Sequence, residues 1–447
     1  MATGRNLAHA ASATCALPGT PLAQASAGLD ACVHCGFCLQ ACPTYVTLED
    51  ENDSPRGRLV LMRRLLEGEI PVTDEATARH LDRCLGCRGC ETACPSGVPY
   101  GALLEATRAT MAPQRGRPLV ARLILAVFRY QPLLRLALAG ARVARATRLP
   151  HLLARLLPRR MAFPFAMLAS TSPRPLPTVA APTGTIEHAP ADGPLGERPP
   201  VRTVMLQGCV MAGLFEHVQA ATATVLTRHG CRLEGAPGQG CCGALHAHAG
   251  DLEGARALAR ANIAAFERAD PELIVVNAAG CGAMLKEYGH LLHDDPTWAR
   301  RAEAIAARVR DVSEFVAASG VVPGARTVSG RITHDAPCHQ QHAQRLVAPP
   351  LQLLRAIPGL DLVPLEDADQ CCGSAGIYNL LEPDVSEAVL GPKLARIAES
   401  EATVVATGNP GCHMQIGAGL LLSGSQARVH HPVELLAASY APSAGSR

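Results

Sequence analysis

The sequence is poor in lysine and in aromatic residues. Only two of its 41 basic residues are lysines, Lys286 and Lys393, and aromatic residues make up 3% of its 447 residues. So few aromatic rings disfavour a platform on which the bases of a single-stranded nucleic acid could stack. The net charge of +2 gives no general attraction to nucleic acids or acidic substrates either. We therefore expect no nucleic-acid partner.

The sequence also lacks the segments that send a protein into or across a membrane. Its N-terminus has no charged stretch followed by an apolar core, so we expect no signal peptide. We also expect no membrane-spanning helix. Clustered cysteines without an export signal are typical of a reducing compartment, so the sequence predicts a cytoplasmic protein.

Cysteine, in contrast, is abundant: there are 18, and eight of them form two matching runs. Both runs follow C-x2-C-x2-C-x3-C-P, the pattern of two-cluster ferredoxins, in which the fourth cysteine of one run binds the cluster of the other. The expected ligands are Cys32, Cys35, Cys38 and Cys94 for cluster 1, and Cys84, Cys87, Cys90 and Cys42 for cluster 2. C-x2-C pairs also bind zinc, but the third and fourth cysteines of each run fit the iron–sulfur pattern better.

The segments around these runs predict helices. Residues 1–30 predict a flexible tail, and residues 31–112 predict an all-α ferredoxin domain that holds two [4Fe–4S] clusters. A Ser-Pro-Arg-Gly-Arg turn at residues 54–58 leads into one predicted helix, and a second is expected over residues 73–83. Arg56 and Arg58 are expected either to cap helices in solvent, to steer an acidic partner or to hydrogen-bond cluster sulfurs.

A basic segment without any acidic residue follows over residues 113–170. It contains eleven arginines, and Pro132, Pro150 and Pro158 are expected to divide it into short helices. A basic amphipathic segment can lie on an anionic membrane surface or grip a partner subunit, although it can also be a solvated connector. We expect peripheral contact with the inner face of the cytoplasmic membrane. A Pro-rich linker is expected over residues 171–200.

From residue 201 onward, strands and helices alternate in a pattern that occurs twice. Matching cysteines are 129 (Cys209 and Cys338), 130 (Cys241 and Cys371, Cys242 and Cys372) and 131 (Cys281 and Cys412) positions apart, which indicates an internal duplication. The two Cys-Cys-Gly repeats are expected over residues 201–325 and 326–447. Helical crossovers favour parallel sheets, so the fold class is multidomain, with the all-α ferredoxin domain followed by a duplicated α/β domain.

Each repeat also predicts a second kind of site. Ligands of open α/β sheets bind beyond the carboxyl ends of strands, where the repeat places two single cysteines beside a Cys-Cys loop. The two expected groups are Cys209, Cys241, Cys242 and Cys281, and Cys338, Cys371, Cys372 and Cys412. They could hold a further iron–sulfur or zinc centre, form a redox-active thiol pair or be structural thiols. His339 and His413 are candidate auxiliary ligands, and Cys231 is expected in the core.

No site for a nucleotide cofactor or an organic substrate is indicated. Residues 238–243 match G-x-G-x-x-G, but no strong strand precedes them and the cysteine pair explains the glycines better. No arrangement of a nucleophile with a base is evident. The chain is therefore expected to carry electrons and not to bind the organic substrate.

Together these motifs resemble the iron–sulfur subunit of glycolate oxidase (glycolate dehydrogenase). The resemblance extends from about residue 31 to residue 435 and rests on ACVHCGFCLQACPTY, SPRGR, HLDRCLGCRGCETACPSGVPY, GQGCCGALHAHAG and DQCCGSAGIYNLL. It implies an electron-transfer subunit whose partner subunits carry FAD and oxidise glycolate to glyoxylate, and often D-lactate too. It further implies that the electrons pass towards a membrane acceptor such as quinone, and that the eight cysteines of the two runs hold the clusters.

The Cys-Cys-Gly repeats are shared more widely, so alternatives stay open. They also resemble repeats of heterodisulfide reductase, of the anaerobic glycerol-3-phosphate dehydrogenase and of lactate-utilisation proteins. In the heterodisulfide reductase form each repeat ends in C-x2-C, whereas Met284 and Gln415 occupy the last position here. The missing fifth cysteine disfavours a double cluster and a thiol–disulfide reductase. A subunit of a glycerol-3-phosphate dehydrogenase or lactate-utilisation complex is the main alternative.

Overall fold

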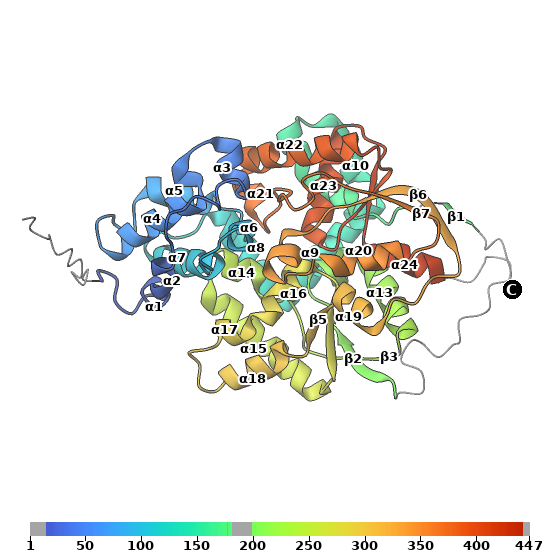
Figure 1. Ribbon diagram of the computed structural model, residues 1–447, viewed down its shortest axis with the longest axis horizontal. Coiled ribbons are helices and arrows are strands. Elements are labelled where there is room, and N and C mark those ends of the chain that lie inside the picture. The colour runs from blue at the N-terminus through green and yellow to red at the C-terminus, as the bar shows by residue number, and fades with distance from the viewer. Residues whose placement is uncertain (1–14, 177, 181–198, 441–447) are drawn as a thin grey trace, which may run out of the picture.

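The computed structural model describes residues 15–176, 178–180 and 199–440, with a helical domain at one end and two α/β units at the other (Figure 1). The N-terminal elements are α1 (Pro21–Gln24), α2 (Ala27–Asp30), α3 (Pro43–Leu48), the 3-10 turn η1 (Glu51–Asp53), α4 (Pro55–Leu66), α5 (Glu75–Asp82), α6 (Gly89–Thr92) and α7 (Tyr100–Arg115). Residues 15–115 contain no strand, which confirms the all-α prediction for this domain.

The turn at residues 54–58 starts α4 for local reasons. The Ser54 hydroxyl accepts a hydrogen bond from the Gly57 amide at 2.9 Å, and Pro55 occupies the first turn, where its missing N–H costs nothing. A side chain at Gly57 would place Cβ 1.9 Å from the carbonyl oxygen of Glu51. The turn therefore fixes the position of α4 against η1.

The prediction of a flexible tail is wrong for residues 21–30. Residues 21–30 form α1 and α2, and Leu22 and Leu29 are buried in the core of the helical domain. The Leu22 amide donates to the Thr110 hydroxyl on α7 at 3.0 Å. Two four-residue helices are too short to give a periodic apolar pattern, which is why the sequence did not reveal them. Residues 1–14 lie outside the described residues.

The basic segment forms α8 (Leu119–Arg129), α9 (Gln131–Ala146), α10 (Leu149–Leu156) and α11 (Arg159–Ser170). The helices begin where the prolines were expected to break them: Pro132 and Pro150 lie in first turns, and Pro158 is an N-cap residue. Within the described part of the chain, no single helix is long and apolar enough to span a membrane. The pair α8 and α9 reaches that length and composition together, but is bent by 104°.

Two sheets with the same strand order follow. The first consists of β2 (Val201–Met205), β3 (Cys231–Glu234), β4 (Leu273–Val276) and β5 (Val309–Asp311), and the second of β6 (Thr327–His334), β7 (Leu360–Val363), β8 (Val404–Ala406) and β9 (Arg428–His430). In each sheet the first strand lies between the second and third, the fourth lies at the far edge, and these four strands are parallel. This arrangement confirms the predicted duplication and the parallel sheets.

The expected linker contributes one further strand. β1 (Thr178–Ala180) pairs antiparallel with the start of β6, so this part of the Pro-rich segment belongs to the second sheet. Residues 177 and 181–198 of the expected linker lie outside the described residues. Short strands at a sheet edge carry little sequence signal, because pairing and not composition decides them.

Helices cover both sheets, and the two repeats share one hydrophobic core. In the first repeat they are α12 (Val210–Leu214), α13 (Glu216–Arg228), α14 (Ala244–His248), α15 (Leu252–Ala269), α16 (Ala279–Lys286), α17 (Tyr288–Leu291), α18 (Ala299–Ala306) and α19 (Val312–Ser319). In the second they are the π-helical turn η2 (His339–Ala343), α20 (Ala348–Arg355), α21 (Tyr378–Leu381), α22 (Pro383–Glu399), α23 (Pro410–Leu422) and α24 (Pro432–Tyr440). Val204 and Ile274 of the first sheet and Ile332 and Val404 of the second belong to the same buried cluster.

Candidate metal centres

The two cysteine runs follow the same backbone path. In both runs the residues two and four positions after the first cysteine have positive φ angles: His34 (54°) and Gly36 (84°), and Gly86 (61°) and Arg88 (65°). Left-handed residues turn a chain sharply, and for a non-glycine residue this conformation is energetically costly. The left-handed conformation recurs at equivalent positions, which indicates that both loops are shaped for the same kind of ligand.

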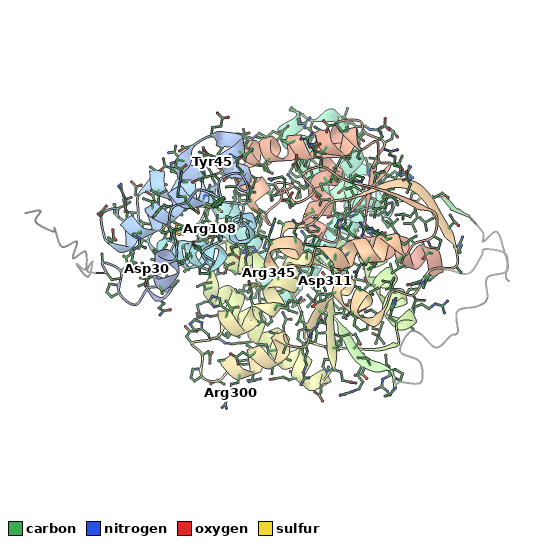
Figure 2. All side chains as sticks on the ribbon, in the orientation of Figure 1. Asp30, Tyr45, Arg108, Arg300, Asp311 and Arg345 are labelled. Carbon is green, nitrogen blue, oxygen red and sulfur yellow. The ribbon has the colours of Figure 1, made fainter. Side chains whose placement is uncertain are left out.

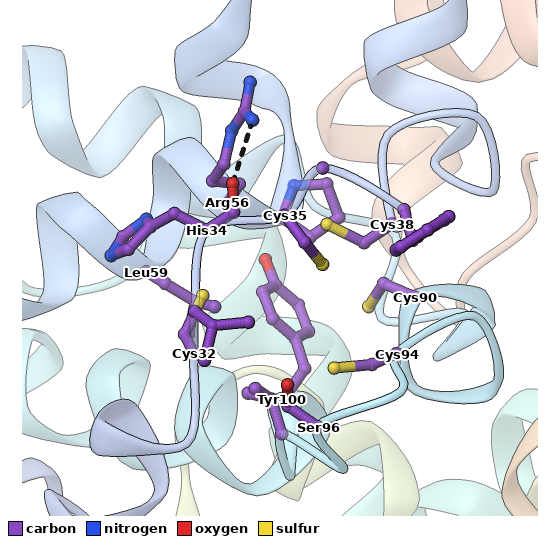
Figure 3. A pocket seen from close by; sticks show the side chains of 15 residues that line it. Cys32, His34, Cys35, Cys38, Arg56, Leu59, Cys90, Cys94, Ser96 and Tyr100 are labelled. Carbon is purple, nitrogen blue, oxygen red and sulfur yellow. Dashed lines mark hydrogen bonds between the residues drawn. The ribbon is translucent and has the colours of Figure 1, made fainter.

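The first loop lines a small cavity of about 30 Å³, here named site 1. Cys32, Cys35, Cys38 and Cys94 line it, and Figure 3 shows their sulfur atoms around the space next to the Tyr100 ring. The lining contains no carboxylate. Thiol donors without hard oxygen donors suit iron–sulfur clusters or zinc rather than magnesium or calcium.

The second loop lines a neighbouring cavity of about 10 Å³, here named site 2, together with Cys42; its cysteines are Cys42, Cys84, Cys87 and Cys90. Cys90 lines site 1 as well, so the two sites are adjacent. The fourth cysteine of each run thus lies with the first three cysteines of the other run, as the ferredoxin pattern requires. Their role as ligands stays a prediction, and the geometry fits it.

Two buried polar side chains face the thiols of site 2. Arg58 is 0% exposed, and its Nη1 lies 3.0 Å from the Thr44 hydroxyl and 4.0 Å from the sulfur of Cys42. The Tyr100 hydroxyl donates to the sulfur of Cys84 at 3.6 Å, and burial raises the Tyr100 pKa well above its ordinary value, which keeps the proton on the phenol. The option of a solvent-facing Arg58 is therefore wrong.

Arg56 behaves differently from Arg58. Its side chain is partly exposed, pairs with Glu51 at 2.8 Å and donates to the carbonyl oxygen of His34 at 3.3 Å. The second contact holds the strained residue of the first cysteine loop, as the dashed line in Figure 3 indicates. Arg56 therefore supports the loop of site 1 through its backbone.

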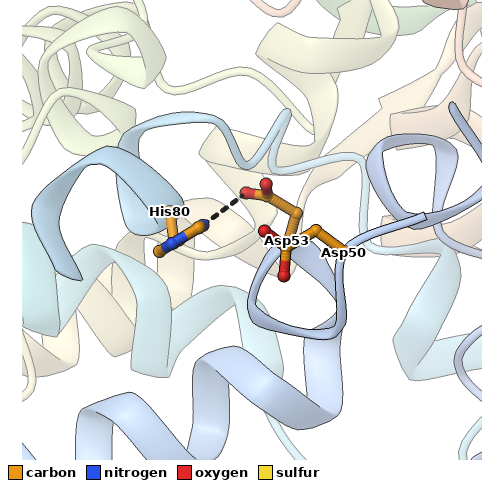
Figure 4. A group of neighbouring side chains, drawn as sticks. All are labelled: Asp50, Asp53 and His80. Carbon is orange, nitrogen blue, oxygen red and sulfur yellow. Dashed lines mark ion pairs between the residues drawn. The ribbon is translucent and has the colours of Figure 1, made fainter. Parts of the chain in front are cut away.

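Asp50, Asp53 and His80 form a compact group beside these sites (Figure 4). Asp53 is fully buried, and it pairs with Arg58 and Arg83 at 3.2 Å each and with Nδ1 of His80 at 3.2 Å. Two arginines already balance its charge, so the group is explained as an ion-pair network without a metal. It connects η1 with α4 and α5 behind Cys42.

The four cysteines of the first repeat come together beyond the ends of β2 and β4. The Cys242 and Cys281 sulfurs are 3.2 Å apart, and Cys241 interacts with both Cys209 and Cys242. The cysteine pair is followed by Gly243 with a φ of 94°, and its counterpart Gly373 has a φ of 85°. A Cβ at Gly373 would lie 2.5 Å from the Ser386 carbonyl oxygen, so glycine is required there.

The second repeat repeats this arrangement with Cys338, Cys371, Cys372 and Cys412, here named the second thiol group. Cys371 interacts with Cys338 and Cys372, and Cys372 interacts with Cys412. Hydrogen bonds from Cys338 and Cys372 lower the pKa of Cys371 well below its ordinary value. One thiolate among neutral thiols suits a soft metal ion, but it also suits thiol redox chemistry.

The second thiol group lies directly beside site 2. Burial and the nearby Cys371 raise the pKa of Cys87, and Cys338 and Cys87 also interact. Cys87, Cys338 and Cys371 belong to one apolar cluster with Leu85 and Tyr378. This proximity joins residues almost three hundred positions apart, and no local sequence signal could have predicted it.

The candidate histidines differ. A ring nitrogen of His339 lies 3.5 Å from the sulfur of Cys338, within η2, and burial lowers the His339 pKa to about 3. Nε2 of His413 lies 3.3 Å from the carbonyl oxygen of Ser170, the last residue of α11. Only His339 is therefore placed near a thiol group. Cys231 is buried on β3, as expected for a core residue.

Comparison with known proteins agrees with this layout. A family model described as a 4Fe-4S dicluster domain matches residues 28–98, and one described as a cysteine-rich domain matches residues 203–286 and 333–417. The chain is 36% identical over 421 residues to the probable glycolate oxidase iron-sulfur subunit of Bacillus subtilis (strain 168), covering 91% of this chain and 92% of that protein. It is 35% identical over 422 residues to the glycolate oxidase iron-sulfur subunit of Escherichia coli (strain K12), covering 92% and 94%. Lactate utilization protein A of Geobacillus kaustophilus (strain HTA426) is 33% identical over 229 residues, 51% of this chain and 95% of that protein.

Proposed function

We propose, from the premise that this chain belongs to the family of glycolate oxidase iron–sulfur subunits, that it carries electrons in a complex that oxidises glycolate to glyoxylate. The observation that supports this most is the unbroken series of thiol sites. Site 1 and site 2 share Cys90, and Cys87 of site 2 interacts with Cys371 of the second thiol group. A [4Fe–4S] cluster takes up and releases one electron at a time, as such a series requires.

The residues of each site would have distinct tasks. Cys32, Cys35, Cys38 and Cys94 would hold the cluster of site 1, and Cys42, Cys84, Cys87 and Cys90 that of site 2. Arg58 and Tyr100 present N–H and O–H groups to the sulfurs of site 2. Such donors stabilise the more negative, reduced state, so they raise the reduction potential.

We assign the further metal centre to the second thiol group. Its position beside site 2 supports an iron–sulfur centre over zinc, because zinc carries no electrons. The four cysteines of the first repeat (Cys209, Cys241, Cys242 and Cys281) interact with one another and lie towards α9, since Gln131 and Arg135 line the cavity next to Cys209.

Electrons are proposed to arrive at site 1 from FAD on partner subunits. Cys35 is exposed, and the neighbouring side chains of Val33 and Phe37 are each 68% exposed. Large apolar side chains at an exposed redox site are typical of a surface that a partner covers. We place FAD on the partner, because the loop at residues 238–243 that matches G-x-G-x-x-G carries the Cys241–Cys242 pair.

Glycolate is expected to bleach the visible iron–sulfur absorbance of the complex purified anaerobically with its partner subunits. Bleaching requires substrate oxidation at the flavin and transfer to sites 1 and 2. D-lactate and glycerol 3-phosphate serve as comparison substrates, and dithionite defines full reduction. Bleaching by glycerol 3-phosphate alone would assign the chain to the related glycerol-3-phosphate complex. If dithionite but none of these substrates reduces clusters in a flavin-containing preparation, the proposed function is incorrect.

We also propose that helices α8 to α11 of the basic segment, here named the connector, rest on an anionic membrane surface. Eleven of the seventeen large exposed hydrophobic side chains among the described residues lie between residues 119 and 161. Five arginines on α8 to α10 are exposed and have no ion-pair partner in the described part of the chain: Arg122, Arg129, Arg135, Arg148 and Arg155. Apolar side chains with free arginines and no acidic residue suit anionic phospholipid better than an acidic protein partner.

Replacing Arg129, Arg135 and Arg148 together with serine is expected to weaken binding to vesicles of anionic phospholipid by about 100-fold, because each basic residue near such a surface contributes about 1 kcal/mol. Vesicle co-sedimentation at low ionic strength measures this. The matched control replaces Arg79, Arg300 and Arg355, which are also exposed but lie on other helices, and should bind as the wild type does. If both triple variants bind the anionic vesicles with equal affinity, the connector is assigned to contact with a partner subunit instead.

A further inference from the structure

A cavity of about 510 Å³ lies between the helical domain and both repeats. Its walls come from the end of α7 and the start of α8, from α14 and from the segment at α21. Cys84 and Leu85 of the second cysteine loop form part of the lining. The cavity therefore reaches the edge of site 2.

Hydrogen bonds hold these walls in place. Arg108, labelled near the centre of Figure 2, donates to the carbonyl oxygens of Leu81 and Cys84 on one side and of His248 on the other, each at 2.8 Å. Arg117 donates to the carbonyl oxygen of Gly250 at 2.9 Å. Because these contacts tie the helical domain to the first repeat, the cavity is built into the fold and is not a loose gap between domains.

The rim of the cavity is apolar and exposed. Leu119 and Val120 on α8 are 78% and 53% exposed, and Leu380 and Leu381 at α21 are 42% and 37% exposed. α8 is also the first helix of the connector that we propose to rest on the membrane. The opening of the cavity is therefore continuous with the surface that would face lipid.

The interior also offers polar groups. Nε of Arg115 is buried and has no hydrogen-bond partner among the described residues, although the guanidinium pairs with Glu75 and Asp82 through its other nitrogens. His248 and Glu382 line the cavity as well. A free donor in a cavity that combines a larger apolar surface with a few polar groups suits a ligand with a carbonyl oxygen on an apolar body.

We propose that this cavity binds the ring of a lipid-soluble quinone, which accepts the electrons from site 2. This inference rests on the proposed function, because it names the acceptor of the same electron series. One quinone takes up two electrons, delivered singly, and two protons, and it leaves as the quinol. The substrate oxidised on the partner subunits supplies the electrons, while water supplies the protons through Glu382 and His248 at the cavity wall. A membrane lipid that only fills the space is the competing occupant.

Photoaffinity labelling locates the ligand without relying on turnover. The whole detergent-solubilised complex is labelled with an azido-quinone, with and without excess short-chain quinone, and the labelled peptides are identified by mass spectrometry. Labelling that the short-chain quinone suppresses is expected within residues 108–121 or 375–382. Labelling confined to a partner subunit, or unaffected by the competitor, would overturn the proposal.

Cavity-filling variants test the electron transfer. Ala112→Trp on α7 is expected to lower glycolate-dependent reduction of a short-chain quinone by tenfold or more, while reduction of ferricyanide, which is water-soluble, stays unchanged. Leu381→Glu at the rim changes less of the packing, and it is expected to raise KM for the quinone. Ala318→Trp on α19, exposed and remote from the cavity, serves as the control. Quinone reduction at the wild-type rate in both cavity variants overturns this proposal. If the wild-type complex does not reduce ferricyanide when glycolate is added, the proposed function itself is contradicted.

Discussion

Cys38→Ser is expected to remove about four of about eight iron atoms from sites 1 and 2 and to abolish electron transfer from glycolate. Cys38 lines site 1 with Cys32, Cys35 and Cys94. A cluster that loses one thiolate keeps three, and serine is a poor substitute for a soft sulfur ligand. Iron per chain, measured by atomic spectrometry, and the visible absorbance should fall together.

Cys15→Ser is the matched control for this variant. Cys15 is an exposed thiol outside both runs, so iron content and electron transfer should stay at the wild-type level. Cys90→Ser provides a second test, since Cys90 belongs to the other run and is predicted to deplete site 2. Iron content that is unchanged in Cys38→Ser and Cys90→Ser would contradict the ligand assignment.

The second large effect is expected from Lys393→Met, which should destabilise the protein by about 3–5 kcal/mol, the cost of leaving one partner of a buried ion pair alone. Lys393 and Asp335 have side chains 1% and 2% exposed, and Nζ lies 3.1 Å from Oδ1 of Asp335. The ammonium also donates to the carbonyl oxygens of Asp367 and Ala368 at 3.0 and 2.9 Å. Asp335 lies three residues before Cys338, and Asp367 and Ala368 lie shortly before the Cys371–Cys372 pair. The cysteines of the second thiol group should therefore move apart in this variant as well.

The other lysine provides the control. Lys286 pairs with Glu314 at 2.6 Å, but both side chains are about one quarter exposed, and Lys286→Met is expected to cost about 1 kcal/mol or less. Denaturant unfolding of the two variants under identical anaerobic conditions gives the comparison. Equal losses of stability in both would show that burial of the Lys393 pair does not have the effect that we assign to it.

Short-range patterns in the sequence were sufficient for much of this structure. The spacing of the cysteine runs predicted two adjacent sites, because three ligands of each site lie in one loop and the fourth follows the other loop. The constant separation of the Cys-Cys-Gly motifs predicted two sheets of the same strand order. Pro132, Pro150 and Pro158 marked helix boundaries because proline is best tolerated in the first turn of a helix, where its missing N–H leaves no hydrogen bond unmade.

Features decided by distant contacts could not be predicted. The packing of α1 and α2 depends on α7, and the strand β1 depends on the edge of β6. The sequence left open whether Arg58 faces solvent, a partner or the cluster sulfurs, since only Asp53 and Thr44, brought close by folding, explain its burial. The contact between Cys87 and Cys371 joins two domains and left no trace in either motif.

The two repeats share one hydrophobic core, and Arg108 hydrogen-bonds to both the helical domain and the first repeat. These contacts make the three parts one rigid body. Domains joined only by small polar interfaces move relative to one another by default, and a redox centre on such a domain must swing before it can react. Here, sites 1 and 2 and the second thiol group would keep fixed separations throughout turnover. The rate of electron transfer would then be set by how often the flavin-bearing partner reaches site 1 and the acceptor reaches site 2.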